Sequence, residues 1–208
     1  MDIQFYGANC VVIGSKQARV VVDDNLADLG AKGISKDGDV ALFTTGQEIS
    51  PRAAKIMIDQ PGEYEVSGVS IYGIAARAHI DTEDQRSATM YKIVLDDTNV
   101  LITGHIYPEL SDSQLEAIGM VDVMIVPVGG NGYTLDGVGA LKLIKKIEPK
   151  VVIPTHFDDS VLQFPVPQQP LEQALKSLAM EPKESVAKLK LKGSELGDVT
   201  QLIVLGKS

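Results

Sequence analysis

The chain has 208 residues, of which 44% are hydrophobic and 23% are charged, and its formal net charge is −9. Length and composition predict one globular domain over residues 1–208 with a substantial core. The acidic balance argues against general nucleic-acid binding, because the surface as a whole repels polyanions. No apolar run approaches the roughly 20 residues that span a bilayer, and the N-terminus lacks a signal-peptide pattern. We therefore expect a cytoplasmic protein that binds neither membranes nor nucleic acid.

The first half of the chain predicts strands joined by short turns. Apolar or alternating segments occur at 2–6, 10–13, 18–22, 40–43, 69–74, 88–95 and 100–103. Residues 60–65 are interpreted as a turn that enters the strand beginning at Val66. The single cysteine, Cys10, rules out an intrachain disulfide and is interpreted as a buried small hydrophobic residue.

The second half alternates strands with helices. Ser111 is a credible N-cap for a helix through Ile118, and helical spacing of apolar residues predicts helices over 136–147 and 171–180. Strands are predicted at 121–128, 151–153, 185–191 and 201–205. Early strands that meander and later strands that alternate with helices indicate a mixed α/β layered domain.

The chain has three histidines, and each follows a predicted strand. They are His79 after 71–74, His105 after 100–102, and His156 after 151–153. Three imidazoles at one rim would make a three-ligand metal site with an open fourth position, which lowers the pKa of bound water. Spacing alone favours solitary loop or core histidines, because no pair shows a local ligand motif.

Other chemistries have less support in the sequence. No G-x-S-x-G nucleophile motif occurs, and Cys10 lies inside a predicted strand. The segment Gly129–Gly132 precedes a helix, but it lacks the Lys-Ser/Thr of a phosphate-binding loop. It is interpreted as a tight turn between a strand and a helix.

Several segments between Met1 and Phe157 follow the order of landmarks in a known family. They are Ile3–Cys10, similar to I-x-Y-L-G-H-S-C, Val20–Asp23, similar to I-L-I-D, Pro61–Val69, Leu110–Leu115, Val126–Gly130 with Tyr133–Asp136, and Val152–His156. In this order they resemble the metallo-β-lactamase fold superfamily, in particular its small uncharacterised hydrolase-like branch. The resemblance implies an α/β fold, a four-layer αβ/βα sandwich with two sheets face to face and helices on both outer sides.

The family's metal-binding loop is where this sequence departs from the pattern. The T-H-x-H-x-D-H motif falls on Thr44–Ser50, so the ligand positions are occupied by Thr45, Gln47, Ile49 and Ser50. Ile49 in place of Asp removes both a ligand and the group that would orient a nucleophilic water. The family's remaining ligand positions fall on His79, on His105 in place of a bridging Asp, and on His156.

The resemblance therefore implies a hydrolase-like protein with a degenerate centre. Such a centre would hold at most one zinc ion, through His79, His105 and His156, with Asp23 or Gln47 as further candidates. Asp23 or Asp81 could then act as base on a small ester, lactone or phosphoester. The alternative is a catalytically inactive member, with a metal-free relic of the site, that serves as a binding or interaction module. The expected partner is a small-molecule substrate or another protein, with self-association left open.

Overall fold

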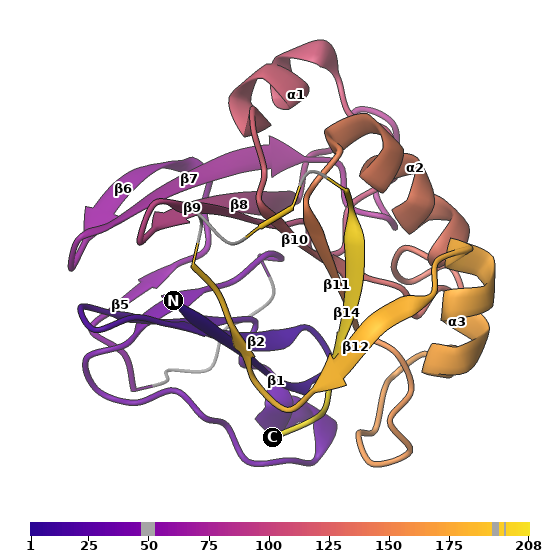
Figure 1. Cartoon of the computed structure of the whole chain (residues 1–208), viewed down its shortest axis with the longest axis horizontal. Coiled ribbons are helices and arrows are strands. Elements are labelled where there is room, and N and C mark those ends of the chain that lie inside the picture. The colour runs from indigo at the N-terminus through magenta and orange to yellow at the C-terminus, as the bar shows by residue number, and fades with distance from the viewer. Residues whose placement is uncertain (47–52, 193–195, 198) are drawn as a thin grey trace.

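Two mixed β-sheets lie face to face in the computed structural model, which describes residues 1–46, 53–192, 196–197 and 199–208 (Figure 1). The six-stranded sheet has the order β13-β1-β2-β3-β4-β5. Its strands are β1 Asp2–Gly7, β2 Cys10–Gly14, β3 Arg19–Val22, β4 Val40–Leu42, β5 Ile56–Ile58 and β13 Leu189–Lys190. The first three strands are antiparallel, whereas β3, β4 and β5 run parallel.

The eight-stranded sheet has the order β12-β14-β11-β10-β9-β8-β7-β6. Its strands are β6 Gly62–Val66, β7 Val69–Ala76, β8 Ala88–Leu95, β9 Thr98–Ile102, β10 Val123–Pro127, β11 Val151–Thr155, β12 Pro182–Val186 and β14 Gln201–Leu205. Strands β6 to β9 form an antiparallel meander, and β9, β10, β11, β14 and β12 are parallel. The hairpin between β8 and β9 turns at Asp96 and Asp97, both with positive φ, as a two-residue turn that matches the strand twist requires.

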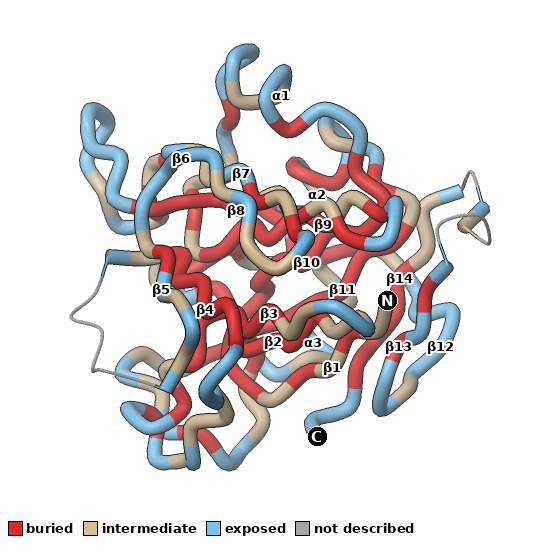
Figure 2. Tube along the Cα trace, turned by 90° about the vertical axis from the view of Figure 1, so that its left-hand side faces the viewer, coloured by how far each residue is buried: buried red, intermediate tan, exposed pale blue. Residues whose placement is uncertain are grey.

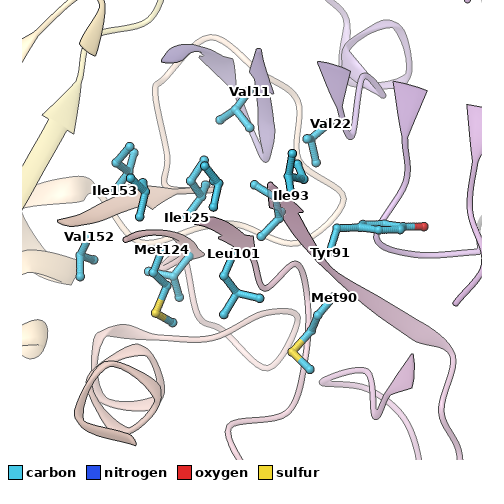
Figure 3. Close-up of a cluster of buried hydrophobic side chains, with 14 of the residues drawn as sticks. Val11, Val22, Met90, Tyr91, Ile93, Leu101, Met124, Ile125, Val152 and Ile153 are labelled. Atoms are coloured by element: carbon cyan, nitrogen blue, oxygen red, sulfur yellow. The ribbon is translucent and has the colours of Figure 1, made fainter. Parts of the chain in front are cut away.

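The central core forms where the two sheets face each other. Successive strand residues point to opposite faces, so Ile93, Ile125 and Ile153 point toward Val11 and Val22 of the other sheet (Figure 3). Their neighbours Leu101, Met124 and Val152 point away, toward the helices (Figure 3). Figure 2 shows the resulting band of buried residues along the inner strands, with exposed residues mainly in the loops, on α1 and on the edge strands β6 and β12.

The helices complete the layers. Helices α1 Asp112–Ile118, α2 Gly137–Ile147 and α3 Leu171–Leu178 lie outside the eight-stranded sheet (Figure 1). The outer face of the six-stranded sheet is covered by the 3₁₀ helix η1 Leu26–Leu29 and by Leu162, which pack on Cys10, Val12 and Val21. The α/β fold class predicted from the sequence is confirmed, although the layer over the smaller sheet is a short 3₁₀ helix with loop segments.

Local predictions fare well for apolar segments. Cys10 is buried in β2, and Ser111 caps α1 in a capping box with Gln114. None of the helices over the described ranges is long and apolar enough to cross a membrane.

Two predictions for polar segments are wrong. Instead of a turn over residues 60–65, Gly62–Val66 form β6, an edge strand whose polar residues can face water while its backbone pairs with β7. Instead of a single strand over 185–191 there are two strands in different sheets, because β12 pairs with β14 and β13 pairs with β1. The prediction of a single strand missed the change of sheet, because the pairing partners of the two halves lie far away in the sequence.

Candidate functional site

Several parallel strands end at one edge of the sandwich. Asp23 follows β3, Thr44 follows β4, His105 follows β9, and His156 follows β11. Since β3 pairs in parallel with β4, and β9 and β11 both pair in parallel with β10, their carboxyl ends lie at the same edge of each sheet. Polar side chains from distant parts of the sequence therefore meet here, as is common at such edges.

One cluster at this edge is a buried network of four polar residues. The Asp23 carboxylate accepts hydrogen bonds from the Thr44 backbone N–H at 2.7 Å, from Thr44 Oγ1 at 2.6 Å and from Asn9 Nδ2 at 2.7 Å. Thr155 Oγ1 donates to Asn9 Oδ1 at 2.6 Å. The network ties the ends of β3, β4 and β11 to the turn between β1 and β2, so it fixes one sheet against the other.

Burial raises the pKa of Asp23, while the hydrogen bonds from Thr44 and Asn9 oppose the increase. Both carboxylate oxygens of Asp23 are occupied by these donors. The base role predicted for Asp23 stays a prediction, and its hydrogen bonds give it a positioning role in the loop that follows β4.

The second cluster contains the three histidines. The rings of His105 and His156 meet edge to face with centroids 4.4 Å apart, and Tyr133 lies 5.2 Å from His105 and 5.8 Å from His156. The His79 backbone N–H donates to the His105 carbonyl oxygen at 2.7 Å. The structure thus gathers the three histidines that the sequence scatters over almost 80 positions.

The His156 side chain depends on an unusual backbone conformation. Its φ is +53°, in the left-handed region that non-glycine residues seldom adopt, and its N–H donates to the Ala8 carbonyl oxygen at 2.6 Å. Nδ1 of the ring lies 3.2 Å from Oε1 of Gln168. A Cβ at Gly129 would lie 2.1 Å from that same Oε1, so glycine is needed at 129 for Gln168 to reach the ring.

All three imidazoles are held neutral. Burial lowers the pKa of His156 to about 4, against an opposing hydrogen bond from Gln168. Burial is the main reason why the pKa of His105 lies well below its usual range. Repulsion from the protonated forms of His156 and His79 lowers it further. Burial also lowers the pKa of His79, although the Ile106 carbonyl and Asp136 oppose it. Neutral imidazoles are the form that coordinates metals.

A small cavity of about 170 Å³ lies beside this cluster. Its lining residues are Thr45, Gly46, Ala78, His79, Ile80, Ser87, His105 and Tyr133. Thr45 stands at a position that the resemblance assigns to a ligand of the family, whereas Gln47, Ile49 and Ser50 lie outside the described residues. The cavity therefore opens where the loop after β4 meets two of the three histidines.

Asp81 organises the wall of this cavity. Its carboxylate accepts hydrogen bonds from the backbone N–H groups of Ala78 and Ser87 and from Ser87 Oγ, at 2.8, 2.9 and 2.6 Å. These hydrogen bonds and the charge of Arg77 lower the pKa of Asp81, although desolvation opposes them as the largest single contribution. Asp81 is not among the residues that line the cavity, and its predicted role as base stays a prediction.

The histidine cluster suits a metal ion in its chemistry. Among the described residues, the Nδ1 atoms of His79 and His105 are buried without a hydrogen-bond partner, and such atoms are costly unless a ligand, water or ion satisfies them. Within the described part of the chain, however, no group of three or more His, Cys, Asp or Glu side chains is arranged to hold a metal ion. The donor chemistry fits a cation, whereas the present ring positions do not gather three ligands.

Comparison with known families identifies the family of this chain. A sequence model of a family described as the beta-lactamase superfamily domain matches residues 2–156. The chain belongs to the metallo-β-lactamase superfamily. The matched range contains the whole histidine cluster and the Asp23 network, and it ends at His156.

Solved structures show that this superfamily member keeps the fold over its full length. A metallo-β-lactamase superfamily protein from Thermotoga maritima is 24% identical and superposes with a TM-score of 0.75, covering 99% of this chain and 98% of its own. A metallo hydrolase from Ignicoccus hospitalis is 18% identical with a TM-score of 0.56, covering 86% of this chain and 90% of its own. At these identities the likeness establishes the fold alone.

A local match with a curated protein is closer in sequence. A UPF0173 metal-dependent hydrolase from Carboxydothermus hydrogenoformans is 43% identical over 44 residues. This match covers 21% of the present chain and 19% of the relative, so the chain is aligned with only about a fifth of that hydrolase.

Sequence reasoning misses three members of the site. Asn9 stands out only as part of a family segment, Tyr133 only as part of another, and Gln168 lies in a proline-rich connector that carries no catalytic motif. Asn9 has the best available signal, since it occupies the turn of its segment. Gln168 has none, because its contact with His156 depends on the path of the connector.

Proposed function

We propose that this superfamily member is a hydrolase-like protein with a degenerate centre, in which His79, His105 and His156 bind a single zinc ion. The observation that carries the proposal is the pair of buried imidazole Nδ1 atoms, on His79 and His105, that lack a partner. Leaving each such atom unsatisfied would cost about 1–3 kcal/mol. A metal bound at these nitrogens would offset that cost.

The neighbouring residues supply the surroundings that such a site needs. Bound zinc would act as a Lewis acid toward a carbonyl or phosphoryl oxygen of the substrate. Gln168 holds the ring of His156 through Nδ1, and the edge-to-face contact orients His105 against it. Ala78 and Ile80 add apolar atoms to the lining of the cavity.

The size of the cavity limits the substrate. Its volume of about 170 Å³ lies below the roughly 300–1,000 Å³ of pockets that enclose drug-sized ligands. The reacting part of the substrate is therefore small, in keeping with an ester, lactone or phosphoester whose remaining portion extends out of the cavity.

A second candidate is a catalytically inactive binding or interaction module. It is favoured by the absence of a three-ligand arrangement in the described ranges and by the full engagement of Asp23 and Asp81 with structural donors. In this case the unpartnered imidazole nitrogens would bind a small polar ligand or water.

Zinc binding distinguishes the two candidates without an activity assay. The purified protein is stripped with chelator, titrated with zinc by calorimetry, and analysed for metal content. We expect one zinc per chain in the wild type and at least a tenfold weaker affinity in His105→Ala, since loss of even a residue that orients a ligand typically costs 10- to 100-fold. Absence of bound zinc in the wild type would leave the inactive module as the function.

A matched variant controls for damage to packing. Phe164 lies against His156 with ring centroids 5.0 Å apart and carries no ligand atom. We expect Phe164→Leu to retain the zinc affinity of the wild type within about threefold. Like His105→Ala, it disturbs the packing of the His156 ring, but it removes no nitrogen. Equal losses in the two variants would mean that the effect of His105→Ala is structural.

A further inference from the structure

We propose that Arg77 binds a carboxylate group of the substrate, in a cleft that adjoins the histidine cavity. The proposal rests on the proposed function only in treating the histidine cavity as the place where the substrate reacts. It narrows the substrate to a small ester or lactone that carries a carboxylate on the portion outside the cavity.

Arg77, His79 and His105 lie on one face of a short pair of antiparallel segments, residues 77–79 and 105–107. Ala78 bridges to Ile106, and the flanking hydrogen bonds run from His79 N–H to His105 and from Tyr107 N–H to Arg77. Residues opposite one another, or two apart, point to the same side of such a pair. Arg77, His79, His105 and Tyr107 therefore project to one side, while Ala78 and Ile106 point into the core.

The Arg77 guanidinium is fixed before any ligand arrives. Its carbon lies 4.0 Å from the centroid of the Tyr107 ring, and Nε and Nη2 donate to the Asp81 carbonyl oxygen at 3.2 and 3.1 Å. The Tyr107 ring in turn lies 5.9 Å from the ring of His79. A guanidinium held on two sides loses little side-chain entropy when it binds a ligand.

The contacts of Arg77 leave one edge of its fork available. Nε and one side of Nη2 are directed to the Asp81 carbonyl, so Nη1 and the other side of Nη2 remain as two parallel donors. This edge has the spacing that binds a carboxylate through both oxygens. Among the described residues no carboxylate forms an ion pair with Arg77, although its charge acts at longer range on Asp81.

The cleft beside this edge is large enough for the body of a small molecule. It has a volume of about 480 Å³, and its lining includes Arg77, Tyr107, Arg86, Glu83 and Glu109. Two arginines and two glutamates leave the cleft with no excess of positive charge. A carboxylate with one charge is therefore favoured over a phosphate dianion, which the two glutamates would repel more strongly.

Neighbouring residues of one short segment line the cleft and the cavity. Arg77 lines the cleft, and Ala78, His79 and Ile80 line the cavity. A molecule anchored at Arg77 would thus place its reacting bond one or two residues away, beside His79. This is the positioning that remote binding groups provide to a reaction.

Direct binding of benzoate tests the assignment independently of metal and catalysis. Benzoate, its neutral analogue benzamide and inorganic phosphate are titrated by calorimetry into the chelator-treated protein. We expect benzoate to bind at least tenfold more tightly than benzamide, and Arg77→Gln to remove this preference, because charge-assisted hydrogen bonds are worth roughly tenfold or more. Equal binding of benzoate and benzamide, or an unchanged preference in Arg77→Gln, would overturn the proposal.

Two further variants in the same titration distinguish the contribution of the charge of Arg77 from that of its two-donor edge. Arg77→Lys keeps the charge but loses the two-donor edge, so most of the preference should disappear. Arg86→Gln removes an exposed arginine of the same cleft that donates only to the carbonyls of Glu83 and Gln85, and it should retain the preference. Tighter binding of phosphate than of benzoate would contradict the carboxylate assignment.

The zinc titration distinguishes a failure of the proposed zinc site from a failure of the proposed carboxylate site at Arg77. If wild type binds benzoate with the expected preference but no zinc, the metal centre fails and the Arg77 site stands. If Arg77→Gln binds zinc normally and only loses benzoate, the loss is not caused by misfolding. Unchanged thermal unfolding of Arg77→Gln provides the same control when no zinc binds.

Discussion

Two buried polar clusters lie at the same edge of the sandwich, and they differ in how their atoms are satisfied. In the Asp23 network every carboxylate oxygen has a donor, and Asn9 and Thr155 extend the chain of hydrogen bonds. In the histidine cluster Nδ1 of His79 and Nδ1 of His105 have no partner in the part of the chain that the structure describes. The Asp23 network has the properties of a structural hydrogen-bond network. The histidine cluster has those of a ligand-binding site.

A single glycine separates the two clusters. Gly104 has φ +63°, and a Cβ there would lie 2.4 Å from the Cβ of Thr44. The residue that follows it is His105. The absence of a side chain at 104 therefore lets the satisfied network and the unsatisfied cluster approach each other, which explains why both can occupy one small edge.

The largest expected effect tests the Asp23 network as a structural tie. Asp23→Ala should lower the free energy of unfolding by about 4 kcal/mol, because three buried donors from Thr44 and Asn9 would lose their acceptor at about 1–3 kcal/mol each. Urea denaturation measures the change. Asp23→Asn, which keeps one carbonyl acceptor, should lose less. A loss below about 1 kcal/mol for Asp23→Ala would break the contrast between the clusters.

The next effect tests the neutrality of His156 through pH. Its pKa is about 4 in the folded protein, against 6.5 for an unperturbed imidazole, so below pH 6.5 the unfolded chain takes up a proton that the folded chain excludes. Stability from this residue is complete above pH 6.5 and should fall by about 3 kcal/mol as the pH drops to 4. Denaturation of the metal-free protein across this range measures it.

A variant without the imidazole isolates this contribution. His156→Asn removes the titrating group, and Asn tolerates the left-handed backbone conformation at 156. The decline between pH 6.5 and 4 should be shallower than in the wild type, and His105 and His79, whose pKa values are also lowered, contribute to what remains. An identical decline in both proteins would show that His156 is not held neutral by the fold.

The smallest effect tests the histidine cluster as an unsatisfied site. His105→Phe keeps a ring against His156 and Tyr133 but removes the unpartnered nitrogen. The free energy of unfolding of the metal-free protein should not fall and should rise by about 1 kcal/mol, since the variant removes a buried nitrogen without a partner and loses no hydrogen bond from Nδ1. A loss as large as that of Asp23→Ala would mean that His105 is a structural residue too.

Apolar pattern and turn chemistry made much of the fold predictable. The alternation in residues 2–6, the buried run before Pro127 and the capping residue Ser111 each specify a local structure from neighbouring residues. The edge strand β6 and the division of 182–190 between two sheets were not predictable, because polar edge strands resemble turns and pairing partners are chosen over long distances. Local patterns carry no record of which sheet a strand joins.

The candidate site divides in the same way. By itself the sequence determined that the chain has three histidines, that each follows a predicted strand, and that residues 44–50 contain no histidine. Only the tertiary structure decided that Thr44 and Asn9 donate to both carboxylate oxygens of Asp23. It also decided that Nδ1 of His79 and Nδ1 of His105 have no partner among the described residues, and that Arg77 lies on the same face as these two histidines. The reason is physical: residue type fixes what a side chain can donate or accept, whereas burial and neighbours, set by packing across the chain, fix whether it already has a partner.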